Sequence, residues 1–197
     1  MNMTTLRLAI IASLLVVAGS FAAACGGDDG GGGDDDGGGG DALTLDAYFE
    51  RVKTIMDRAE ESGDAVETEI DERIGEATEV GEMLNALADG LDTFQGVAAD
   101  VASDLGDIDP PSEVESQHRQ LTAVFDVAAS ALDGLRSDVD EIDPDGAEEV
   151  ILEQLTEFGT NVETEFGSLE TQSEVLCFEL QAIADENSID IDLDCGD

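Results

Sequence analysis

The sequence predicts an all-α protein: an antiparallel bundle of three to four long helices, with an extended C-terminal tail pinned by a disulfide. Two observations lead to this fold class. From Leu43 onward, apolar residues recur at spacings of three and four, which is the period of a helix with one buried face. Short segments of proline, glycine and aspartate interrupt this pattern, and short connections place consecutive helices side by side in opposite directions.

The chain divides into three parts: residues 1–24, 25–41 and 42–197. A length of 197 residues suffices for one domain with a core, preceded by a targeting segment and a linker. In the first part, Arg7 is the only charged side chain, and the segment 8–24 is apolar or small throughout. A charged start, an apolar middle and small residues at the end are typical of an export signal. Because such a run is also near the minimum length that spans a bilayer, an uncleaved membrane anchor is the alternative.

Cys25 and the three residues before it resemble the lipobox of bacterial lipoproteins. In that family the cysteine thiol receives a diacylglyceryl group, and the cysteine becomes the amino terminus after cleavage. Ala22, Ala23 and Ala24 precede Cys25, and only Ala22 departs from the usual pattern, which has leucine there. The resemblance implies that residues 1–24 are a lipoprotein signal peptide and that Cys25 carries acyl chains such as palmitate. It implies a location at the cell membrane, lipid-anchored on the extracytoplasmic face. The alternative is a plain cleaved signal that leaves a free thiol.

The segment after Cys25, residues 26–41, contains only glycine and aspartate. The glycine-rich calcium-binding repeats of secreted toxins need an apolar residue in each turn, and this segment has none. Ordering a glycine chain around an ion also costs much conformational entropy. We therefore interpret the segment as a disordered tether rather than a metal-binding tract. A flexible chain of this length has an end-to-end distance of about 22 Å.

The helical bundle domain at 42–197 is predicted to open with a helix capped by Thr44, with Leu43 packing on Tyr48 as a hydrophobic staple. The apolar stripe then continues for roughly 60 residues, which in one helix would extend roughly 90 Å. That length is too great for a compact domain, so a turn is required. The segment 75–81 is the preferred position for the turn, and 62–64 is the alternative.

Two proline-containing segments delimit the remaining helices. The segment "DIDPPSEVE" at 107–115 ends the second helix, and Ser112 is predicted to cap the third, with Glu115 as its capping-box partner. The segment "DEIDPDG" at 140–146 ends the third helix. A fourth apolar stripe then runs from Val150 to Ile183.

The C-terminal segment "ENSIDIDLDCGD" breaks the helical period and alternates apolar with acidic residues, which predicts an extended tail. Three cysteines cannot all pair, and an unpaired cysteine in an exported protein needs an explanation. If Cys25 carries lipid, Cys177 and Cys195 are left to form a disulfide with each other. Such a bridge would stabilise the fold by about 3 kcal/mol in the chain-entropy estimate.

No residue pattern predicts a catalytic, metal or cofactor site, so the chain is not expected to be an enzyme. Asp190, Asp192 and Asp194 resemble the start of a calcium loop, but the glycine and the glutamate that such a loop requires are missing. His118 is the only histidine and lies on the third apolar stripe, where a core or boundary position is the expectation. No phosphate-binding loop or nucleophile motif is present.

The charge balance is extreme. Asp and Glu number 49 against 7 Lys and Arg, which gives a formal net charge of −42. A surface of this kind repels nucleic acid and anionic lipid headgroups, so both are rejected as partners of the domain. The acidity favours two further hypotheses, namely a binding protein for cations or a cationic ligand, and an adaptation to saline surroundings.

Several segments together resemble a group of uncharacterised bacterial lipoproteins. They are the lipobox cysteine, the Gly/Asp tether, "ALTLDAYFERV" at 42–52, "IDPPSEVESQH" at 108–118 and "CFELQAIADENSIDIDLDC" at 177–195. The resemblance implies a location and a fold, and it carries over no catalytic or ligand residue. The first functional hypothesis is therefore a lipid-anchored helical interaction or structural module of the cell envelope. Its partners would be the membrane, through the anchor, and an envelope protein; the sequence does not indicate an oligomeric state.

Overall fold

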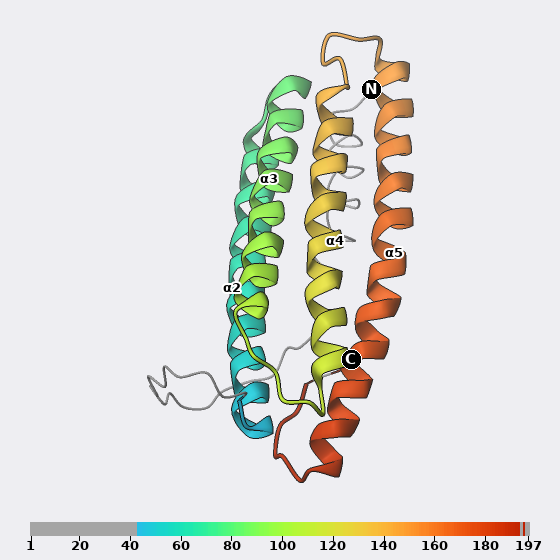
Figure 1. Ribbon diagram of the computed structural model, residues 1–197. Coiled ribbons are helices and arrows are strands. Elements are labelled where there is room, and N and C mark those ends of the chain that lie inside the picture. Colours follow the sequence, from blue (N-terminus) through green and yellow to red (C-terminus); the bar gives the residue numbers. More distant parts are fainter. Residues whose placement is uncertain (1–42, 194, 196–197) are drawn as a thin grey trace.

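The computed structural model describes residues 43–193 and 195, and within them it confirms the predicted all-α fold (Figure 1). The described residues form four helices: α2 (Leu45–Glu76), α3 (Val80–Gly106), α4 (Glu115–Asp140) and α5 (Glu148–Glu186). Consecutive helices run in opposite directions, and no strand occurs in the described residues. The predicted signal peptide and tether, residues 1–41, lie outside them.

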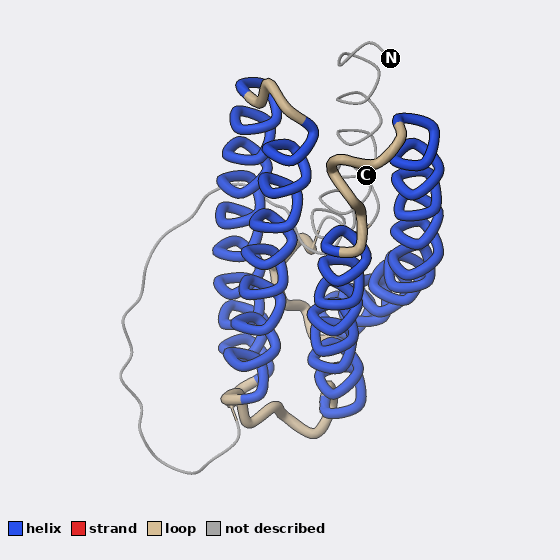
Figure 2. The backbone as a smooth tube through the Cα atoms, turned by 90° about the horizontal axis from the view of Figure 1, so that it is seen from above, coloured by secondary structure: helices blue, strands red, loops and turns tan. Residues whose placement is uncertain are grey.

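The helices pack in chain order. α2 lies against α3, α3 against α4 and α4 against α5, and the remaining pairings are at most marginal. Figure 2 shows α2 and α3 as one pair, with α4 beside it and α5 beyond α4. Among the described helices, α5 is therefore supported extensively by one neighbour alone.

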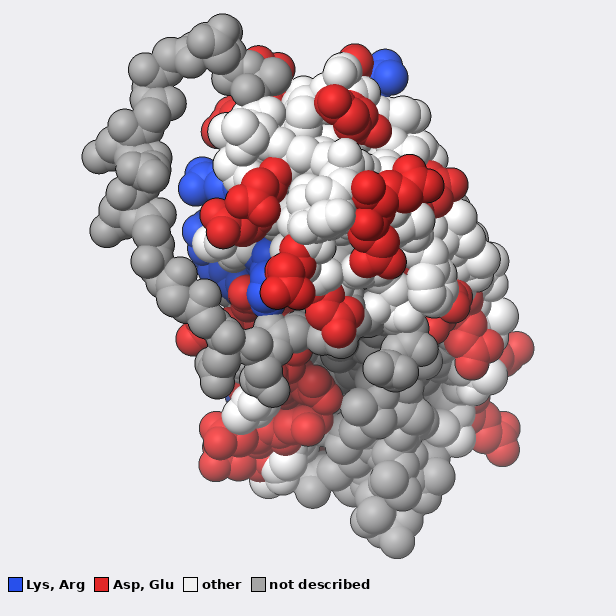
Figure 3. Space-filling view, turned by 90° about the horizontal axis from the view of Figure 1, so that it is seen from below, with Lys and Arg blue, Asp and Glu red and all other residues white. Residues whose placement is uncertain are grey.

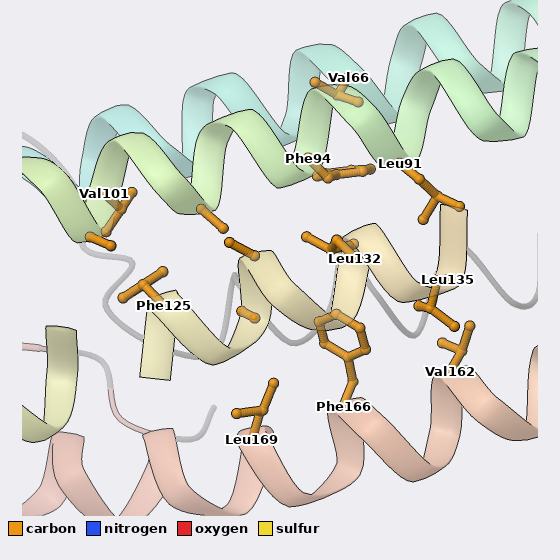
Figure 4. Packing of buried hydrophobic residues seen from close by; sticks show 14 of the residues in the cluster. Val66, Leu91, Phe94, Val101, Phe125, Leu132, Leu135, Val162, Phe166 and Leu169 are labelled. Carbon is orange, nitrogen blue, oxygen red and sulfur yellow. The ribbon is translucent and has the colours of Figure 1, made fainter. Parts of the chain in front are cut away.

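The core consists of apolar side chains from all four helices. In Figure 4, Phe94 of α3 points toward Leu132 of α4, and Phe166 points from α5 toward the other side of α4. None of the three is more than 3% exposed, and burying one side chain of this kind contributes roughly 1.5–3 kcal/mol. One predicted core position is wrong: Val150 is 49% exposed. The adjacent Ile151, which is 4% exposed, takes the inward position at the start of α5.

The turn between the first two helices lies in the preferred segment, 75–81, because α2 ends at Glu76 and α3 begins at Val80. A capping box fixes the start of α3: the carboxylate of Glu82 accepts hydrogen bonds from the backbone N–H groups of Thr78 (2.7 Å) and Glu79 (3.3 Å). These bonds lower the pKa of Glu82. The alternative turn at 62–64 is wrong, since these residues continue α2.

The two predicted N-caps differ in outcome. Thr44 caps α2 as expected, with its hydroxyl oxygen accepting from the Ala47 N–H at 3.3 Å. The capping box predicted for Ser112 and Glu115 is wrong, because Val114 is the N-cap of α4 and no side chain caps that end. The Val114 N–H donates to the Pro111 carbonyl at 3.1 Å, and this turn moves the helix start beyond Ser112. Val114 is fully buried. Its burial in the core fixes the start of α4 two residues after the position that the capping rule predicts.

The C-terminal tail is extended, as predicted, and it folds back along α5. Ser188 makes the reversal with φ of 60°, which is in the left-handed region. Gln181 of α5 then pairs with the tail backbone: its amide donates to the Ile191 carbonyl (3.1 Å) and accepts from the Leu193 N–H (2.9 Å). A glutamine side chain thus supplies the hydrogen bonds that a neighbouring strand would otherwise provide.

Candidate functional site

The predicted lipidation site, Cys25, lies outside the described residues. Lipidation of Cys25 and location at the membrane therefore stay predictions. Within the described residues, no helix combines the length and the apolar character needed to cross a bilayer.

The sulfur atoms of Cys177 and Cys195 lie at disulfide-bonding distance, with their Cα atoms 5.6 Å apart. Cys177 is buried in α5, and Cys195 follows the tail that Gln181 holds in place. This geometry agrees with the predicted disulfide and ties the end of the chain to the last helix. A sulfur in a disulfide has no thiolate to act as a nucleophile.

His118 occupies the predicted core position and is 5% exposed. Its Nδ1 atom lies 3.4 Å from the hydroxyl oxygen of Tyr48, and the two rings meet edge to face with their centroids 5.7 Å apart. Burial lowers the pKa of His118, although a hydrogen bond to the backbone of Leu105 acts in the opposite direction. Burial therefore favours the neutral imidazole, which links α4 to α2 and α3 inside the core.

The acidic side chains do not gather into a metal site in the part of the chain that the structure describes. No three His, Cys, Asp or Glu residues among the described ones are arranged to hold an ion. Asp190 and Asp192 are exposed on the tail, and Asp194 lies outside the described residues. Figure 3 shows the lower face of the molecule, on which acidic side chains form several separate groups.

Ion pairs between helices of the described residues all involve α3. Their cations come only from α2 and α4, since neither α3 nor α5 contains Lys or Arg. The ion pairs that join helices are Arg58 to Asp104 (2.8 Å), Arg73 to Asp89 (2.6 Å) and Arg136 to Asp92 (3.1 Å), and in each the acid belongs to α3. No ion pair involves a carboxylate of α5 among the side chains that the structure describes.

Side chains that are both large and apolar are exposed on α5. Val175 is 55% exposed and Phe178 is 52% exposed. They are three residues apart, so they lie next to each other on one side of the helix. Apolar spacing does not mark them as core positions, and their place outside the apolar stripe of this helix is the sequence signal for their exposure.

Comparisons with known proteins do not assign this surface a role. No protein-family model matches the chain. No curated protein and no solved structure is significantly similar to it.

Proposed function

We propose that the protein is a membrane-anchored extracytoplasmic lipoprotein whose helical bundle acts by contact, as an interaction or structural module of the cell envelope. The observation that carries this proposal is the exposed pair Val175 and Phe178 on a helix supported by one neighbour. Exposed aromatic and aliphatic side chains that lie together are typical of contact surfaces between proteins. The only histidine is buried and the cysteines of the described residues are paired, which favours contact over catalysis.

The anchor is proposed from the sequence. Two acyl chains at Cys25 give stable membrane residence, whereas a single chain would be marginal. The Gly/Asp tether then separates the bundle from the surface by about 22 Å. Its aspartates are repelled by anionic headgroups, which extends the tether further. The bundle is thereby presented to partners beyond the headgroup layer.

Photo-crosslinking in intact cells tests the contact function. A photoreactive amino acid in place of Phe178 should form a crosslink to a defined envelope protein. The same residue in place of Val127, which is 52% exposed on α4, is the matched control and should not capture that protein. Equal capture from both positions, or capture from neither, contradicts a contact surface on α5.

A further inference from the structure

The side of α5 that points away from the core carries a line of uncharged residues, here called the outer stripe. It comprises threonines at 156, 160, 164 and 171, followed by Val175, Phe178 and Ala182, all of them exposed. Their spacings of three, four and seven place them in one line along the helix. At 1.5 Å per residue the line is roughly 39 Å long.

The threonines of the outer stripe are suited to burial under a partner. Each hydroxyl donates to the carbonyl one turn earlier: Thr156 to Leu152 (2.8 Å), Thr160 to Thr156 (3.0 Å), Thr164 to Thr160 (2.8 Å) and Thr171 to Gly167 (3.1 Å). Because each hydroxyl proton is already bonded within the helix, covering these side chains leaves no donor unsatisfied. Their methyl groups then extend the apolar surface that Val175 and Phe178 begin.

Acidic residues border the outer stripe on both sides. Glu163, Glu170 and Glu174 lie along one edge, and Glu157, Glu179 and Glu186 lie along the other; all six are exposed. No lysine or arginine in α5 can neutralise them, and the cross-helix ion pairs of the described residues involve acids of α3. Glu179 accepts a hydrogen bond from the neutral amide of Gln117 at 3.2 Å.

We propose that the outer stripe binds a helical segment of a partner protein whose apolar ridge is flanked by lysine or arginine. The uncharged line offers an apolar contact, and the acidic borders select positive flanks. A second copy of this chain would bring acidic borders against acidic borders, and an anionic membrane would be repelled in the same way. This inference rests on the proposed contact function and names the chemistry of its partner.

Peptide titration against the full chain, purified in detergent at physiological ionic strength, tests the inference. The probe is a synthetic helix of about 25 residues, matched to the length of the stripe, with leucines at spacings of three and four and lysines on both flanks. A second peptide has the same composition in scrambled order, and a third carries glutamate in place of lysine. The chain variants are the double substitution Val175→Glu with Phe178→Glu, the double substitution Thr164→Glu with Thr171→Glu, and Val127→Glu as the control.

The basic ridge peptide should bind at least tenfold more tightly than either of the other two peptides. Both stripe variants should weaken its binding at least tenfold, and Val127→Glu should not. Since two separate stripe variants are used, a folding defect in one, detected by circular dichroism, leaves the other to decide. Equal binding of the scrambled peptide, equal binding of the acidic peptide, or self-association of the chain through the stripe would each overturn the inference. Binding in detergent does not depend on a lipid at Cys25, so failure of the anchor and failure of this inference are distinguishable.

Discussion

Replacing Gly90 with alanine probes how closely α2 approaches α3. A Cβ atom at Gly90 would lie 2.5 Å from Cγ1 of Ile70 on α2, and closer still to Cδ1. Ile70 is 2% exposed, so its side chain cannot move aside into solvent. Glycine at this position is therefore required by the close approach of the two helices.

The expected effect follows from opposing contributions. Alanine in a helix interior is favoured over glycine by up to about 1 kcal/mol. Overpacking the core, which includes forcing Ile70 off its rotamer, costs about 1–3 kcal/mol. We expect Gly90→Ala to lower the free energy of unfolding by about 1–2 kcal/mol, which corresponds to a Tm lower by roughly 3–6 °C for a domain of this size.

Gly96→Ala in the same helix is the matched control. A Cβ built at Gly96 meets no heavy atom within 4 Å beyond the adjacent residues and the nearby backbone of its own helix, so this substitution should raise the free energy of unfolding by about 0.5–1 kcal/mol. Both variants are measured by urea denaturation, in which the slope with denaturant should remain unchanged.

A double-mutant cycle completes the test of the contact. Ile70→Ala removes Cγ1 and Cδ1, the two atoms that a Cβ at Gly90 would overlap, so the effects of Ile70→Ala and Gly90→Ala should be less than additive. Equal stabilisation by Gly90→Ala and Gly96→Ala, or full additivity with Ile70→Ala, would refute the packing of α2 on α3 described above.

Three further predictions concern the core, the tail and the disulfide. The pKa of His118 is lowered in the folded protein, so the unfolded state binds more protons as the pH falls through about 6.5. The stability that the neutral His118 contributes is present above that pH and is lost below it. The free energy of unfolding should therefore change less between pH 7.5 and pH 5.5 in His118→Gln than in the wild type. The same change in both proteins would refute the burial of a neutral His118. Ser188 has φ of 60°, so Ser188→Gly should be at least about 1 kcal/mol more stable than Ser188→Val, and equal thermal stability would contradict the reversal at this residue. Reduction should lower the free energy of unfolding by about 3 kcal/mol in the wild type and leave the double variant Cys177→Ser, Cys195→Ser unchanged, whereas a wild type indifferent to reductant would exclude the bridge.

The helices could be predicted from the sequence because burial on one face imposes a regular spacing of apolar residues. The length of the apolar stripe also predicted a turn between α2 and α3, since a single helix of that length would be too long for a compact domain. Rules for short segments were less secure. Thr44 caps its helix, but Ser112 does not, because the rule takes no account of the turn after Pro111 or of the burial of Val114.

Apart from the Cys177–Cys195 pair, side-chain contacts between different segments of the chain could not be predicted. The approach of His118 to Tyr48 depends on how α2 and α4 are rotated about their axes, which apolar spacing does not determine. The pairing of Gln181 with the tail depends in the same way on the reversal at Ser188. The exposure of Val175 and Phe178 indicates a contact surface because α5 packs extensively on α4 alone, and this packing does not follow from the sequence.

The mass of the mature chain purified from membranes tests most directly the claim that Cys25 anchors the bundle. Proteolysis followed by mass spectrometry should yield an amino-terminal peptide that begins at Cys25 and carries a diacylglyceryl group on its sulfur. A chain that retains residues 1–24, that begins elsewhere, or whose Cys25 is unmodified would contradict the lipid anchor.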